Sequence, residues 1–171
     1  LRSGSLAQMI LDKFKLDTRV ALVTGSATGI GRAIAVALAE AGADVACHCR
    51  KVGDAQDTVE EIRAIGCNAI EIPGDMADKD VPERVVDEVI RSWGRIDILI
   101  NNAGMIRRSP AAEYSENDWQ MVIDVNLSSL FRLSQVAGRR LIEQGSGKIV
   151  NIASLLSFQG GLNVPAYSAA K

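Results

Sequence analysis

The sequence predicts an α/β fold in which helices cover both faces of a parallel, doubly wound β-sheet. Two observations support this prediction. From residue 19 onwards, short apolar runs alternate with longer amphipathic stretches, and glycines stand where the predicted helices end, as at Gly42, Gly66 and Gly94. With 171 residues, the chain is long enough for one domain with a substantial core. We therefore expect a single layered unit.

The first half of the chain alternates three predicted strands with three predicted helices. The apolar runs that predict strands are 19–25, 44–49 and 68–73. The amphipathic stretches that predict helices are 29–41, 54–65 and 81–93. In the second of these helices, Val59, Ile62 and Ile65 recur at three-residue steps among polar residues, which is typical of a helix with one buried face.

The second half predicts two more strands around one long helix. Residues 96–104 predict a strand that runs into a turn, and 148–154 predict the fifth strand. Between them, 115–144 keep a helical pattern, which we expect to break near 124–126 because Asn is a poor interior helix former. The expected strand order is 3-2-1-4-5, which leaves strand five as an exposed edge.

The composition excludes several classes of partner. A net charge of −2, with 47% hydrophobic and 23% charged residues, gives no basic excess for nucleic acid or membrane surfaces. No run approaches the ~18 apolar residues of a membrane span. We expect small-molecule partners or further copies of the chain. Residues 1–8 look foreign to the native chain, which we expect to start at Met9, so that 9–171 form the domain.

The cysteines predict a reduced, cytoplasmic protein without a metal centre. Cys47, Cys49 and Cys67 form no C-x-x-C pattern of the kind that binds zinc or acts as a redox dithiol. Cys47 and Cys49 flank His48, but a metal site would need further ligands. We therefore interpret the C-H-C run as strand packing and expect no metal.

A glycine-rich segment between the first strand and the first helix predicts a phosphate site. It reads TGSATGIG from Thr24 to Gly31. Glycines allow a sharp turn and a close approach of backbone to ligand, and a helix N-terminus attracts phosphate. The spacing G-x-x-x-G-x-G differs from G-x-G-x-x-G, the better-known fingerprint of the Rossmann type of sheet. A turn of this composition without a ligand remains an alternative.

Two further segments follow predicted strands, where doubly wound sheets bind ligands. Asp75 comes just after the third strand, and Asn-Asn-Ala-Gly at 101–104 ends the fourth. Taken alone, Asp75 could cap the next helix and the second segment could be an ordinary turn.

The last eighteen residues hold a candidate proton-transfer pair. Tyr167 and Lys171 share one helix face at i,i+4 spacing, and Ser154 stands thirteen positions before the tyrosine. An ammonium ~4 Å from a phenolate stabilises it by roughly 4 kcal/mol at an effective dielectric of ~20. The alternatives are a helix surface for the pair and a cap for the serine.

Taken together in this order, TGSATGIG, NNAG, Asn126, Ser154 and YSAAK resemble the short-chain dehydrogenase/reductase family, from Arg19 to the last residue. The resemblance implies hydride exchange between a nicotinamide cofactor and a secondary alcohol or ketone. It makes Tyr167 the general acid/base, tuned by Lys171. Ser154 would hold the substrate oxygen, and Asn126 would link Lys171 to solvent through water.

The resemblance also implies a set of cofactor contacts, and the cofactor is NAD or NADP. Cys49 stands where an acidic residue would bind the ribose hydroxyls of NAD, and Arg50 and Lys51 follow, which favours NADP; a solvated surface for both is the alternative. The predicted contacts are Gly25, Ser26, Thr28, Gly29, Ile30, Gly31, Arg50, Asp75, Met76, Asn102, Ala103, Gly104, Tyr167 and Lys171.

Within the family, NNAGMIRR and SLLSFQGGLNVPAYSAAK resemble the enzymes that act on 2-deoxy-D-gluconate or 2-dehydro-3-deoxy-D-gluconate. Arg107 or Arg108 would then bind the substrate carboxylate, and Gln159 would contact hydroxyls, with Ser154 at the reacting oxygen. Two exposed loop arginines are the alternative. A 3-oxoacyl-carrier-protein reductase, which shares every catalytic motif, is the alternative function.

The family's chains continue by roughly another third beyond YxxxK, to seven strands in all. We therefore expect a domain that lacks its C-terminal part, in which a short final helix holds Tyr167 and Lys171 poorly. A catalytically incompetent dinucleotide-binding fragment is the second alternative. The full-length protein is expected to form a homodimer or homotetramer through helix 115–144 and the helix of Tyr167.

Overall fold

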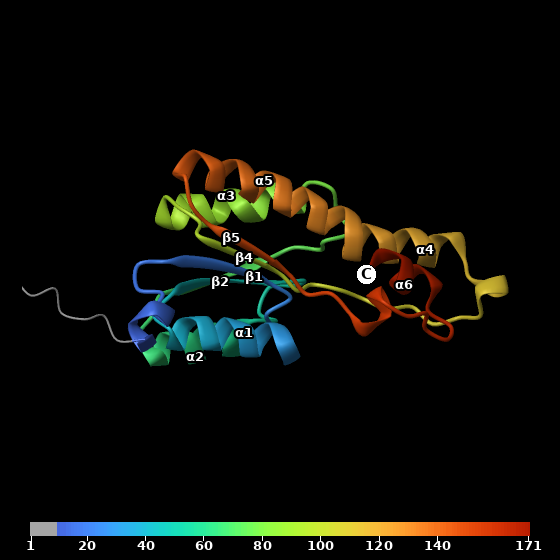
Figure 1. Cartoon of the computed structure of the whole chain (residues 1–171), viewed down its shortest axis with the longest axis horizontal. Coiled ribbons are helices and arrows are strands. Elements are labelled where there is room, and N and C mark those ends of the chain that lie inside the picture. Colours follow the sequence, from blue (N-terminus) through green and yellow to red (C-terminus); the bar gives the residue numbers. More distant parts are fainter. Residues whose placement is uncertain (1–9) are drawn as a thin grey trace, which may run out of the picture.

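In a computed structural model, which describes residues 10–171, five parallel strands form one sheet in the order β3-β2-β1-β4-β5 (Figure 1). This is the predicted order. The strands are β1 Val20–Thr24, β2 Asp44–Cys49, β3 Ala69–Pro73, β4 Ile98–Asn101 and β5 Lys148–Asn151. The proposed start at Met9 and the residues before it lie outside the described part of the chain.

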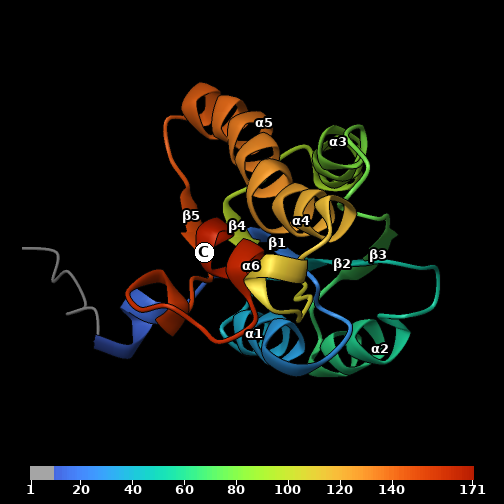
Figure 2. The same cartoon turned by 90° about the vertical axis from the view of Figure 1, so that its right-hand side faces the viewer.

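Helices cover both faces of the sheet, as Figure 2 shows in end view. α1 Gly29–Glu40 and α2 Gln56–Ile65 lie on one face, and α3 Val81–Trp93 and α5 Ser129–Gln144 lie on the other. Each face buries its own apolar cluster, because the central strands are apolar on both sides. The first cluster includes Val23, Val45, Ala35 and Ile62, and the second Leu22, Leu99, Val85 and Leu133.

The predicted ends of these helices are confirmed to within one or two residues. α3 spans the predicted 81–93, and α2 starts two residues later than predicted. Gly66 and Gly94 follow α2 and α3 in the left-handed conformation, with φ of 104° and 71°. A residue with a Cβ would be strained there, so these glycines end the helices for a steric reason.

The last two strands are shorter than predicted. β4 stops at Asn101 because the next two backbone N–H groups, of Asn102 and Ala103, donate to the side chain of Thr24. β5 stops at Asn151, and soon after it Ser154 caps a short 3-10 helix, η4 Leu155–Ser157. Side-chain acceptors and caps thus end these strands where the apolar pattern would continue.

The predicted break in the long helix is present but is a π-turn. α4 Glu116–Ile123 passes through η3 Asp124–Ser128 into α5. Within it, the Asn126 amide donates to the carbonyl of Val122 at 2.9 Å, and the Ser129 hydroxyl donates to that of Val125 at 2.7 Å. The carbonyls of Val122 and Val125 therefore stay bonded at the widened turn, and α4 continues into α5 without a break.

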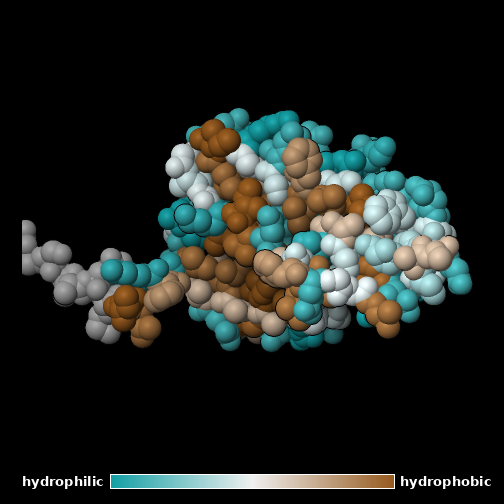
Figure 3. All heavy atoms as spheres, turned by 45° about the vertical axis from the view of Figure 1, so that its right-hand side comes forward, coloured by the Kyte–Doolittle hydropathy of each residue, from teal (hydrophilic) through white to brown (hydrophobic). Residues whose placement is uncertain are grey.

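The edge strand β5 is exposed, as predicted. Ile149 and Val150 are 37% and 44% exposed, and Figure 3 shows apolar side chains gathered across this side of the molecule. The final helix, α6 Pro165–Ala170, packs against α4, the π-turn and η4. Among residues 10–171, no helix has both the length and the apolar character that crossing a membrane requires.

Candidate active site

The glycine-rich segment forms a tight loop between β1 and α1. Gly25 and Gly29 take φ values of +66° and +56°, in the region that favours glycine. A Cβ on Gly31 would lie 2.1 Å from the carbonyl oxygen of Gly25, so the loop closes on itself at a spacing that only glycine permits. The sharp, closely packed turn that the glycines of this segment predict is therefore present.

The segment after β4 is bound to this loop by its own polar groups. Thr24 Oγ1 accepts hydrogen bonds from the backbone N–H groups of Asn102 and Ala103, both at 2.9 Å. The Asn102 amide donates to the carbonyls of Thr24 at 2.9 Å and Gly25 at 3.2 Å. Asn102, predicted as a cofactor contact, thus positions the glycine loop in the structure.

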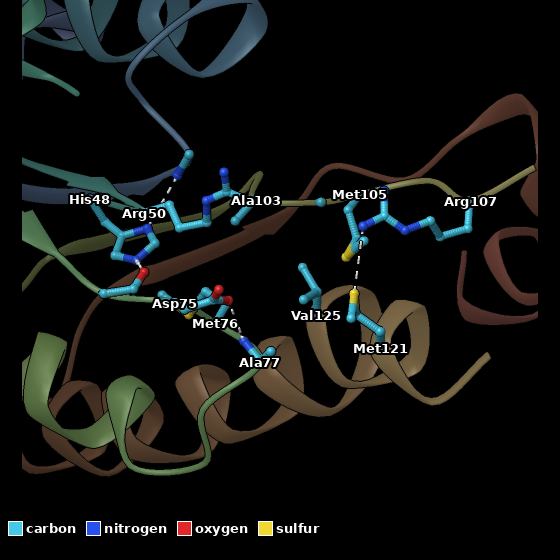
Figure 4. A pocket seen from close by; sticks show the side chains of 13 residues that line it. His48, Arg50, Asp75, Met76, Ala77, Ala103, Met105, Arg107, Met121 and Val125 are labelled. Carbon is cyan, nitrogen blue, oxygen red and sulfur yellow. Dashed lines mark hydrogen bonds between the residues drawn. The ribbon is translucent and has the colours of Figure 1, made fainter. Parts of the chain in front are cut away.

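A cavity of about 250 Å³ opens at the carboxyl ends of the strands (Figure 4). This is where doubly wound sheets bind ligands. The predicted cofactor residues that line it are Gly25, Arg50, Asp75, Met76, Ala103 and Gly104.

The remaining residues of the loop lie outside this lining. Ser26 is buried, and its hydroxyl donates to the carbonyl of His48 at 3.2 Å. Thr28, Gly29 and Ile30 are exposed around the start of α1, where the backbone N–H groups of a helix are unpaired. Their cofactor contacts stay predictions.

Asp75 does not cap the next helix, which was the alternative considered from the sequence, because the N-cap residue of α3 is Asp80. Asp75 Oδ1 accepts from the backbone N–H of Ala77 at 3.0 Å, which closes a local turn before α3. Its exposed carboxylate also lines the cavity.

The end of β2 presents a basic side chain to the cavity. Arg50 is exposed, and Figure 4 shows its side chain extending along the cavity.

The nearby carboxylate of Glu71, on β3, accepts from the N–H groups of Gly53 and Ala55, both at 2.8 Å, and from the Cys49 thiol at 3.4 Å. Burial opposes its charge, but these donors outweigh burial, so the pKa of Glu71 lies below its usual value. The sequence analysis missed this residue, although a glutamate within an apolar strand was a signal.

His48 is a second residue whose role the sequence analysis missed. It is 2% exposed, its Nδ1 accepts from the Gly25 N–H at 3.3 Å, and its Nε2 donates to the Gly74 carbonyl at 2.9 Å. Burial, aided by Arg84, lowers its pKa to about 4. The expected strand packing is confirmed, and among residues 10–171 no group of His, Cys and acidic side chains is arranged to hold a metal.

Tyr167 and Lys171 lie on and at the end of α6. The Nζ atom of Lys171 is 5.9 Å from the centroid of the Tyr167 ring and donates to the carbonyl of Ile152 at 2.6 Å. Burial lowers the pKa of Lys171. The helix of the predicted pair is thus formed, and its ammonium is anchored to the chain just beyond β5.

Two serines connect the end of β5 to α6. Ser154 Oγ accepts from the backbone N–H of Leu156 at 3.2 Å, which is the cap considered from the sequence. Ser157 Oγ accepts from the N–H of Ser154 at 3.2 Å and donates to the carbonyl of Lys171 at 2.6 Å. Ser157, which the sequence analysis did not single out, thus joins the predicted substrate-binding serine to the predicted lysine.

Asn126 holds the segment that follows β4. Its Oδ1 accepts from the N–H of Met105 at 3.1 Å, and its Nδ2 donates to the Met105 carbonyl at 2.8 Å. A Cβ on Gly104 would lie 2.7 Å from Asn126 Oδ1, so glycine permits this approach. Because the π-turn and η4 both contact α6, the four predicted catalytic residues gather at one end of the molecule.

The predicted substrate residues separate into two groups. Arg107 lines the cavity, forms an ion pair with Asp118 at 3.4 Å and points to Met121 in Figure 4. Arg108 and Gln159 are exposed and do not belong to the cavity lining. The geometry therefore distinguishes Arg107 from its neighbour, while their substrate contacts stay predictions.

Known proteins resemble both the sequence and the fold. A 2-dehydro-3-deoxy-D-gluconate 5-dehydrogenase of Dickeya dadantii is 44% identical over 164 residues, which are 95% of this chain and 64% of that protein. A 3-oxoacyl-[acyl-carrier-protein] reductase of Staphylococcus aureus is 38% identical over 155 residues, or 90% of this chain and 63% of that protein.

Among solved structures, a protein of Agrobacterium tumefaciens assigned as a 2-deoxy-D-gluconate 3-dehydrogenase, with bound NADP, superposes with a TM-score of 0.82 at 49% identity, over 92% of this chain and 61% of that one. The chain thus spans less than two thirds of the length of these relatives. The family model of short chain dehydrogenases matches residues 19–171. The chain belongs to the short-chain dehydrogenase family.

Proposed function

We propose that the whole protein is an NAD(P)-dependent oxidoreductase that interconverts a secondary alcohol and a ketone. The observation that carries this proposal is the Tyr167–Lys171 pair, anchored at Ile152 and packed against the π-turn that holds the cavity segment at Met105. A bound nicotinamide cofactor supplies hydride transfer. The tight glycine loop, the cavity beside it and the basic Arg50 fit a dinucleotide.

The chain's own residues handle the proton. In the reducing direction, Tyr167 gives its phenolic proton to the carbonyl oxygen while hydride adds to the carbonyl carbon, and in the oxidising direction both steps reverse. The Lys171 ammonium stabilises the phenolate that remains. The Ser154 hydroxyl holds the substrate oxygen near Tyr167. Asn126 supports the site from the π-turn by holding the backbone of Met105.

NADP is the cofactor that the β2 end favours. Arg50 is exposed at the cavity and suits a 2′-phosphate, while Cys49 replaces the acidic residue that would bind ribose hydroxyls. The Glu71 carboxylate is held by three donors and is not free for the ribose. The Agrobacterium tumefaciens protein also carries NADP.

The substrate that we propose is a sugar acid of the deoxygluconate class, in line with the name of the Dickeya dadantii relative. Arg107 at the cavity could exchange its ion pair with Asp118 for a pair with the substrate carboxylate. A 3-oxoacyl thioester is the alternative, because the Staphylococcus aureus relative acts on that class by name.

Self-association and location belong to the same proposal. Leu127 and Phe131 on the outer side of the long helix are 45% and 63% exposed, which supports a homodimer or homotetramer through this helix. The cysteines are free thiols, which fits a reducing cytoplasmic compartment.

Steady-state rates of the full-length protein test the function. We expect turnover of 2-dehydro-3-deoxy-D-gluconate, faster with NADP than with NAD, and little turnover of a short 3-oxoacyl thioester. Preference for the thioester would favour the reductase alternative. Dinucleotide binding without turnover of either compound would favour a binding module, and absence of both would contradict the proposal.

A further inference from the structure

His48 lies one residue before the end of β2, between the two turns that border the cavity. In the sheet register it stands opposite Thr24 of β1 and Ile72 of β3. Its ring receives a hydrogen bond from the Gly25 N–H at 3.3 Å and gives one to the Gly74 carbonyl at 2.9 Å. One side chain thus spans the turns that follow the strands on either side of β2, as the dashed lines in Figure 4 show.

The chemistry of the two partners fixes the state of the ring. A backbone N–H can only donate and a carbonyl can only accept, so Nδ1 must be unprotonated and Nε2 must carry the proton. Both the imidazolium ion and the other neutral tautomer would place an N–H against the Gly25 N–H. The bridge therefore exists only in the neutral form with the proton on Nε2, which agrees with the lowered pKa of this buried ring.

Backbone groups at the same strand end reinforce the bridge. The His48 carbonyl accepts from the N–H of Ser26 at 3.0 Å and from its hydroxyl at 3.2 Å. The Cys49 carbonyl accepts from the N–H of Gly74 at 2.8 Å. Gly74 is thus held through both its N–H and its carbonyl. The glycine loop is held through two consecutive residues, Gly25 and Ser26.

Both bridged turns face the ligand cavity. Gly25, Gly74 and the adjacent Asp75 line it together with His48 itself. An apolar side chain at this position would leave the Gly25 N–H and the Gly74 carbonyl without the partners they have here, at a buried site. The distance between the two turns would then no longer be set by a hydrogen-bonded ring.

We propose that His48 is a positioning residue for the dinucleotide: its neutral ring sets the spacing between the glycine loop and the Gly74–Asp75 turn. This inference rests on the proposed function, because it concerns the same cofactor site. His48 acts through the two turns and need not touch the reacting atoms. It also occupies the Gly25 N–H, so that phosphate must be bound by later groups of the loop.

Two substitutions at His48 and one matched control test the inference in the full-length protein. His48→Leu removes both hydrogen bonds, whereas His48→Gln retains one acceptor and one donor in a single planar amide. Val45→Ala is the control, because it truncates a fully buried side chain of the same strand without touching either turn. Thermal unfolding by circular dichroism establishes that each variant is folded.

The readout is the Kd for NADP and for NAD, measured by titration calorimetry. We expect His48→Leu to raise both values by about tenfold or more, because a buried donor and acceptor lose their partners. His48→Gln should stay within about threefold of wild type and Val45→Ala within about twofold, since each keeps the two turns bridged. A merely structural role would make His48→Leu and the control alike.

The outcomes separate this inference from the proposed function. If wild type binds neither dinucleotide, the proposed function fails and the inference fails with it. If wild type binds and folded His48→Leu binds equally well, only the inference is overturned. If His48→Leu does not fold, nitrogen NMR of the wild-type ring decides. We expect a proton on Nε2 and none on Nδ1 at neutral pH, both with and without NADP. A proton on Nδ1 would overturn the inference.

Discussion

The Lys171 ammonium, at the C-terminal cap of α6, lies 5.9 Å from the centroid of the Tyr167 ring one helical turn earlier. Its other contact is with the Ile152 carbonyl at 2.6 Å, so the cation is held between the end of β5 and the phenol. Because burial lowers the pKa of Lys171, its charge is more costly here than in water. Buried charged groups with a shifted pKa are typical of functional sites.

Lys171→Met should lower kcat/KM by about 10²-fold, because it removes the cation beside the phenol, and an ammonium about 5 Å from a phenolate oxygen stabilises it by roughly 3 kcal/mol at an effective dielectric of ~20. Lys171→Arg is the matched variant that keeps the charge and should retain more activity. Initial rates over a range of pH measure both. Equal losses in the two variants would mean that shape, and not charge, matters at this position.

Arg50→Ala should raise the Kd for NADP by about tenfold and leave that for NAD within about twofold, because only NADP carries the 2′-phosphate that Arg50 is proposed to bind. Lys51→Ala is the control, since Lys51 is exposed outside the cavity lining. Fluorescence titration with the reduced cofactors measures these constants. Parallel changes for the two cofactors would count against a 2′-phosphate site at Arg50.

Arg107→Ala should raise the KM for a sugar acid by about tenfold or more and that for a neutral polyol much less, because it removes the cation that is proposed to bind the substrate carboxylate at the cavity. Arg108→Ala should change neither by more than about twofold. The two variants are compared by steady-state kinetics. If the Arg107 variant affects acid and polyol alike, the carboxylate assignment is wrong.

The buried His48 predicts a loss of stability in acid. Its pKa falls from an ordinary 6.5 to about 4, through burial and then Arg84 on α3, with the Gly74 carbonyl and the Asp75 carboxylate acting in the opposite direction. Between these values the unfolded chain binds a proton that the folded chain does not, so stability is full above pH 6.5 and declines as pH falls toward 4.

The contribution of this residue is on the order of 3 kcal/mol across that range. His48→Gln has no titrating group at the position, so urea unfolding at a series of pH values should show a smaller decline for the variant than for wild type. Identical pH dependence of the two proteins would show that the pKa of His48 does not change on folding, and so would contradict its burial in solution.

The strands and helices follow from local sequence, and the strand order follows from the doubly wound fold that their alternation predicts. Alternation of apolar runs and helical patterns gives the parallel sheet, and Gly66 and Gly94 mark helix ends through their own φ values. The two strand ends that differ, Asn101 and Asn151, depend on acceptors and caps elsewhere in the chain. Local pattern contains no information on those partners.

In the site, too, contacts between residues close in sequence can be predicted, and contacts between distant residues cannot. Tyr167 and Lys171 can be paired from their spacing, because i,i+4 residues share a helix face. The contacts of His48 with Gly74, of Glu71 with Ala55 and of Ser157 with Lys171 cannot be read from spacing, because they join residues 26, 16 and 14 positions apart. Which of the two adjacent arginines faces the cavity likewise depends on how the loop after β4 folds, and the structure selects Arg107.

The most direct measurement is the rate of nicotinamide oxidation or reduction by the full-length protein and its Tyr167→Phe variant, with 2-dehydro-3-deoxy-D-gluconate as substrate. The substitution removes one oxygen and keeps the ring beside Lys171, so kcat should fall by about 10²–10⁴-fold while the Kd for the dinucleotide stays within about twofold. Turnover by the variant at the wild-type rate would contradict the proton-transfer role on which the proposed function depends.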